Sequence, residues 1–90
     1  MTKPNFFENL VCAAQWPVKA NGDQKNYFIF QILDNNGYAN QVFYRDMALH
    51  GAADMIETVA KAFVQKKRLK IYLSDPSNML VDRVELGPLA

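Results

Sequence analysis

The sequence has one cysteine and one histidine among its 90 residues, and its four glycines are scattered at positions 22, 37, 51 and 87. A lone cysteine, Cys12, excludes an internal disulfide and fits a reducing compartment. A zinc site needs about four His, Cys or carboxylate ligands, and Cys12 with His50 supplies too few. Scattered glycines leave no phosphate-binding loop. We therefore expect no metal and no cofactor.

Catalytic constellations are also missing. A Cys12–His50 nucleophilic pair is formally possible, but Cys12 lies in an apolar segment typical of a small buried hydrophobe. His50 lies in a connector beside Gly51. Asp46 and Asp54 do not form a recognisable acid–base pair. We predict a protein that is not an enzyme and has no catalytic residues.

Long apolar runs and an excess of one charge are absent too. The opening MTKPNFFENL lacks the apolar centre and cleavage site of a signal peptide, and no stretch approaches the roughly 20 apolar residues of a membrane helix. We expect a cytoplasmic protein with no membrane contact. Ten basic residues face nine acidic ones. That balance argues against a protein that coats duplex DNA.

What the sequence does contain is a series of short apolar segments separated by turn signals. Its length suits one domain over residues 1–90, with 1–8 and 88–90 expected to be flexible. Turns are predicted at 20–23, 34–37 and 75–78, where Asn, Asp, Gly and Pro cluster. Strands are predicted at about 9–19, 25–34, 38–45, 68–74 and 79–86, with Gly87-Pro88 ending the last one. In the first strand Leu10, Cys12, Ala14 and Trp16 recur with a period of two.

Between the third and fourth predicted strands the apolar period changes. Ala52, Ile56, Val59 and Phe63 are spaced by four, three and four residues, with Met55 and Ala62 on the same side. This spacing predicts one apolar face of an amphipathic helix over about 52–66.

The segment from 25 to 45 predicts a hairpin with two chemically different faces. A tight turn at Asn35-Asn36 or Asn36-Gly37 places Phe28, Phe30 and Ile32 on one face with Ala39, Gln41 and Phe43. The other face carries Tyr27, Ile29, Gln31 and Leu33 with Tyr38, Asn40, Val42 and Tyr44. The phenylalanine-rich face is predicted to be core. The tyrosine and amide face is predicted to point outward, because tyrosine combines an apolar ring with a polar tip.

The order of three strands, a helix and two strands resembles that of the OB-fold. The stretch KKRLKIYLSDPSNMLVDRVELG is similar to the end of many such domains. The resemblance covers about residues 9–87, and small bacterial single-stranded-nucleic-acid-binding proteins share the layout. It implies a mostly β fold, a five-stranded OB-like Greek-key barrel with one helix between strands three and four.

The same resemblance implies a binding surface on the outer face of strands two and three, where aromatic rings stack on bases. Arg68 and Lys70 are expected to share the outward face of strand four with Tyr72 and to meet phosphates. Lys66 and Lys67 are explained by the helix dipole. We therefore predict an accessory protein that binds single-stranded DNA or RNA. The expected contact residues are Tyr27, Gln31, Tyr38, Asn40, Tyr44, Arg45, Arg68, Lys70 and Tyr72.

A second interpretation uses the same tyrosine face differently. Tyrosine is favoured in strands whatever their function, so the face could contact a protein partner, with a homo-oligomer as one possibility. The balanced charge keeps this alternative open. Phe6 and Phe7 could likewise pack against the barrel or against a neighbouring subunit. Charge geometry separates the two functions: Arg68 and Lys70 beside the tyrosine face would favour nucleic acid.

Overall fold

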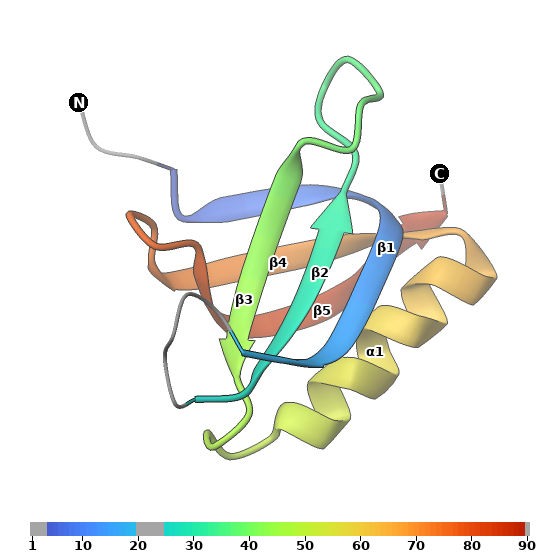
Figure 1. Cartoon of the computed structure of the whole chain (residues 1–90). Helices are drawn as coiled ribbons and strands as arrows, with labels where there is room; N and C mark the ends of the chain where they lie inside the picture. Colours follow the sequence, from blue (N-terminus) through green and yellow to red (C-terminus); the bar gives the residue numbers. More distant parts are fainter. Residues whose placement is uncertain (1–3, 20–24, 90) are drawn as a thin grey trace.

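The computed structural model describes residues 4–19 and 25–89 (Figure 1). Its elements are β1 (Phe6–Val18), β2 (Tyr27–Ile32), β3 (Gln41–Asp46), α1 (Ala52–Gln65), β4 (Lys67–Asp75) and β5 (Leu80–Leu89). The strands close into a barrel in the order β1-β2-β3-β5-β4. This confirms the mostly β, five-stranded barrel with one helix between β3 and β4. The turn predicted at 20–23 lies outside the described residues.

The barrel closes because the long β1 pairs with two different strands. Its first half runs antiparallel to β4, up to Leu10 opposite Arg68, and its second half runs antiparallel to β2 from Val11 opposite Ile32. Register shifts follow Val11 and Gln15, and such bulges bend a strand. They also break the simple alternation expected for this segment. Val11 is the buried residue, whereas Trp16 is 56% exposed.

The core lies between the inner faces of the strands. Phe30 and Phe43 pair across β2 and β3, and their rings stack with centroids 5.4 Å apart. Leu69 and Ile71 of β4 and Val81 of β5 complete this layer, each at most 1% exposed. Burying a side chain of this size contributes about 1.5–3 kcal/mol, so this layer supplies much of the driving force for folding.

Helix α1 packs against the barrel through the predicted apolar face, but only part of that face is covered. Ala52, Met55, Val59 and Ala62 are buried. The helix ends at Lys66, whose left-handed backbone directs its N–H to the carbonyls of Ala62 and Phe63. Phe63 was expected on the buried face and is instead 56% exposed. The apolar stripe is wider than the surface that the strands present to it.

The β2–β3 connection is longer than the tight turn predicted from the sequence. Ile32 pairs with Gln41, the register that a turn centred on Asn36-Gly37 would give, and the residues between them leave the ladder. Gly37 has φ of +84°, which explains the glycine there. The loop projects from one end of the barrel (Figure 1). Because the register is unchanged, the predicted division of the two faces holds for the paired residues of β2 and β3. It fails for residues 38–40, which lie in the loop, so Ala39 is exposed although it was expected in the core.

The last strand does not stop at Gly87-Pro88 as expected but continues to Leu89. β5 pairs with β3 at Leu80, opposite Tyr44, and beyond that point β4 is the only strand paired with it among the described residues. Proline is tolerated on such an edge because its missing N–H can face solvent. A Cβ on Gly87 would lie 2.8 Å from the Arg68 carbonyl oxygen, so glycine permits this close approach.

Candidate nucleic-acid interface

Two of the predicted tyrosines meet on the outer surface of β2 and β3. The Tyr27 and Tyr44 rings lie edge to face, with centroids 6.1 Å apart and an interplanar angle of 85°. Both side chains are half-buried. Beside them a pocket of about 240 Å³ extends to Ser74 and Leu80, next to the turn between β4 and β5. We call this surface, with Ile29 and Val42, the tyrosine face.

The amide-bearing residues lie at the far end of the same two strands. Gln31 donates from Nε2 to the Ala39 carbonyl at 3.2 Å, which ties β2 to the loop. Asn40 donates from Nδ2 to Asp34 Oδ2 at 3.0 Å. Tyr38 is 65% exposed on the loop. Gln31 and Asn40 therefore already have partners, whereas the Tyr38 ring is open to solvent.

Asp34 organises this loop through its carboxylate. Its Oδ1 accepts hydrogen bonds from the backbone N–H groups of Tyr38 at 2.9 Å and Asn36 at 2.8 Å. The Tyr38 N–H is the main reason that the pKa of Asp34 lies below its ordinary value. Desolvation opposes this shift, and the Asn36, Asn40 and Gly37 donors support it. The loop thus carries a fixed negative charge at neutral pH.

Arg45, predicted as a surface charge, faces the interior instead. It lies opposite Phe28 on the inner side of the β2–β3 ladder and is 8% exposed. Its guanidinium donates to the carbonyls of Val81, Asp82 and His50 at 2.8–2.9 Å. The Nε atom has no partner. Arg45 is therefore committed to joining β3, β5 and the connector before α1, and it is unavailable to an outer ligand.

The three predicted contacts on β4 form a separate surface. Tyr72 lies between Phe6 of β1 and Arg83 of β5. The centroids of the Phe6 and Tyr72 rings are 5.0 Å apart. The guanidinium carbon of Arg83 lies 3.8 Å from the centroid of the Tyr72 ring. In the next row Lys70 lies opposite Glu8 on one side and Glu85 on the other. Lys70 therefore has a carboxylate-bearing residue on each side.

The β4 surface and the tyrosine face do not adjoin. In the barrel order β1 and β5 lie between β4 and the β2–β3 pair. Figure 1 shows β2 and β3 crossing in front of β4 and β5. The arrangement that would favour nucleic acid, with Arg68 and Lys70 beside the tyrosines, is not found, because β1 and β5 separate the strands that carry them. The ion pair closest to the tyrosine face joins Lys25 and Asp46 at 3.6 Å, and both residues line its pocket.

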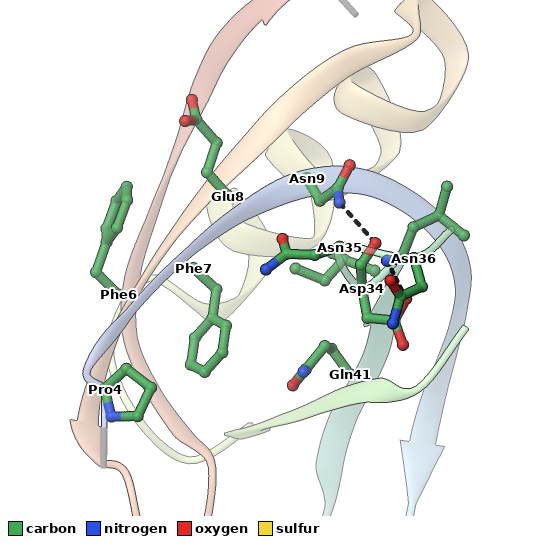
Figure 2. Close-up of a pocket in the computed structure, with 11 residues that line it drawn as sticks. Pro4, Phe6, Phe7, Glu8, Asn9, Asp34, Asn35, Asn36 and Gln41 are labelled. Atoms are coloured by element: carbon green, nitrogen blue, oxygen red, sulfur yellow. Dashed lines mark hydrogen bonds between the residues drawn. The ribbon is translucent and has the colours of Figure 1, made fainter. Parts of the chain in front are cut away.

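Sequence reasoning missed a cleft of about 510 Å³ at the open end of the barrel (Figure 2). The first residues of β1 form one wall and the β2–β3 loop forms the other, joined where Asn9 donates to the Asp34 carbonyl at 3.2 Å. The Phe7 ring meets the core ring of Phe43 edge to face at 5.2 Å. Phe7 therefore packs into the barrel, while Phe6 packs on Tyr72. Because the cleft depends on the path of β1, no local motif could have indicated it.

Other kinds of site have no support in the described part of the chain. No group of three or more His, Cys, Asp or Glu residues could hold a metal ion there. No helix in the described ranges is long and apolar enough to cross a membrane. No protein-family model, curated protein or solved structure matches this chain.

Proposed function

We propose that this protein binds single-stranded nucleic acid on the tyrosine face, in an accessory role without catalysis. The observation that carries the proposal is the edge-to-face pair of Tyr27 and Tyr44 on the outer surface of β2 and β3. Each ring is half-buried, so it is held in place by its neighbours while part of it remains accessible. Rings fixed in this way lose little entropy when a base stacks on them.

The path along the strands offers further contacts. From Tyr27 and Tyr44 a strand of nucleic acid would pass the apolar side chains of Ile29 and Val42 and reach the exposed ring of Tyr38 on the loop. Each stacked base contributes roughly 1–3 kcal/mol. Two or three stacked bases would therefore account for weak to moderate binding with little sequence preference.

The charges on this surface determine how the binding responds to salt. Among the described residues, Lys25 is the one cation that lines the pocket beside the tyrosines, and it lies against Asp46. The Asp34 carboxylate lies at the other end of the path. Few phosphates can be neutralised here, so stacking supplies most of the affinity. We expect a slope of log K against log salt near −0.7, the value for about one phosphate on a single strand.

Fluorescence anisotropy of a labelled mixed-sequence single-stranded oligonucleotide, titrated at several salt concentrations, tests this proposal. Saturable binding with a shallow salt slope would support it. A slope near −3 would instead indicate about four phosphate contacts and would move the site to the basic surface of β4. Absence of binding at tens of micromolar protein in low salt would eliminate the proposal.

A further inference from the structure

The second half of β1 has strand partners along only one of its two edges. Residues from Val11 to Val18 pair with β2, whereas the pairing with β4 ends at Leu10. The backbone groups of a strand point alternately to its two edges. Between residues 12 and 16, the backbone groups that point away from β2 therefore face an edge that no strand in the described ranges occupies. Exposed edges of this kind are templates for an added strand.

An apolar groove of about 280 Å³ runs beside this open edge, between β1 and α1. Residues 11–14 form one wall, Ile56, Ala60 and Phe63 form the other, and the buried Phe28 and Val59 form the floor. None of the lining residues is charged. The groove exists because α1 leaves part of its apolar stripe uncovered.

Large apolar side chains extend the groove onto the surface. Trp16 and Phe63 are each 56% exposed and Val64 is 76% exposed. Trp16 lies two residues beyond Ala14 in β1, and Phe63 and Val64 follow Ala60 on the same side of the helix. Aromatic side chains beside an apolar groove are the residues that most often dominate binding energy in protein interfaces.

One end of the groove is strongly basic. Lys66, Lys67 and Arg68 follow α1 directly, and Arg68 lies opposite Leu10, the residue before the groove begins. In the described ranges the ion pairs are Lys25–Asp46, Lys61–Glu57 and Arg83–Glu85, so these three cations have no acidic partner there. Their charge complements a ligand that carries carboxylates at one end.

We propose that this groove binds an extended segment of a partner protein, apolar along its length and acidic at one end. The segment adds as a strand to the open edge of β1 and places alternate apolar side chains in the groove. Its carboxylates meet Lys66, Lys67 and Arg68. An unpaired strand edge selects an extended segment over a helix, because only an extended backbone can satisfy it. This site is distinct from the tyrosine face and does not depend on it.

Trp16 is the only tryptophan in the sequence, so its fluorescence reports on the part of β1 that continues beyond the groove. The probe is a short acetylated peptide that alternates valine with serine and carries a run of glutamates at its N-terminal or C-terminal end. Both versions are needed because a strand can add in either direction. We expect one of them to shift the Trp16 emission to shorter wavelength in a saturable way. The same peptide with lysines in place of glutamates should bind at least tenfold more weakly.

Three variants locate the site. Ala60→Glu places a carboxylate in the groove and should abolish the shift. Arg68→Glu should weaken binding at least tenfold, whereas Lys61→Glu, the same charge change at a cation that already pairs with Glu57, should leave it within about twofold. Ala60 is exposed, so its substitution should preserve the far-ultraviolet circular dichroism of the fold. Ala60→Glu should also leave oligonucleotide binding unchanged, which separates this site from the tyrosine face.

Two results would overturn the proposal. Peptides of both orientations could leave the Trp16 emission unchanged. Alternatively, the free protein could sediment as a dimer with Trp16 emission already at short wavelength, and Ala60→Glu could convert it to a monomer with red-shifted emission. The groove would then be filled by a second copy of the chain.

Discussion

Arg45 lies opposite Phe28 on the inner side of the β2–β3 ladder, so a guanidinium takes a place in the layer that phenylalanines otherwise fill. Its donors reach carbonyls on β5 and on the connector before α1. These contacts join segments that are 36 and 5 residues away from Arg45 in the sequence. Arg45 is therefore a structural residue of the barrel.

Replacing Arg45 with alanine should destabilise the fold, because it leaves the buried Val81 carbonyl without its side-chain donor and opens a cavity. Losing a hydrogen bond from a charged group and leaving its partner buried costs about 1.5–3 kcal/mol. We expect a loss of that size in urea unfolding. The exposed Arg83, substituted in the same way, should cost less than about 1 kcal/mol. Equal losses would contradict the structural role of Arg45.

The β2–β3 loop should respond to acid through Asp34. The pKa of this carboxyl is lowered in the folded protein, chiefly by the Tyr38 N–H. A lowered pKa means that the loop contacts are fully present above the unfolded value and are lost as the pH falls through the folded value. The amide resonances of Asn36 and Tyr38 should therefore titrate together, with a midpoint below 3.8, the ordinary value for this group. Asp34→Asn should remove that titration; its persistence would mean that another group controls the loop.

Gly37 provides a test of the loop backbone. Its φ is +84°, and a Cβ there would meet nothing within 4 Å, so any cost of substitution comes from conformation alone. Gly37→Ala should destabilise the protein by about 1–2 kcal/mol in thermal or urea unfolding. Gly37→Asn should cost less, because asparagine adopts the left-handed region more readily. Similar losses for both variants would contradict the assigned conformation.

Local patterns predicted those parts of the fold that depend on neighbours in sequence. The alternation in the paired residues of β2 and β3 separated the inner and outer faces correctly, and the spacing from Ala52 located α1. The same alternation, extended by two residues from Phe43, would have placed Arg45 inside. That signal was present but outweighed by the usual preference of arginine for the surface.

Features that depend on the register between distant strands could not be predicted. The separation of Lys70 from the tyrosine face follows from the barrel order, and its placement between Glu8 and Glu85 follows from two ladders. The exposure of Phe63 and Trp16 follows from the bulges in β1 and the position of α1. The period of apolar residues in a helix or strand predicts which residues share a face. It does not predict whether another element covers that face.

The most direct test of the tyrosine face compares Tyr44→Leu with Tyr72→Leu in the anisotropy titration. Both tyrosines are half-buried on outer strand surfaces, and leucine preserves much of the apolar packing while removing the ring. Tyr44→Leu should weaken oligonucleotide binding about tenfold, equivalent to about 1.4 kcal/mol and within the range for one stacked base. Tyr72→Leu should leave it unchanged, with both variants folded by circular dichroism. Loss of binding in Tyr72→Leu alone, or in neither variant, would contradict the assignment of binding to the face formed by Tyr27 and Tyr44.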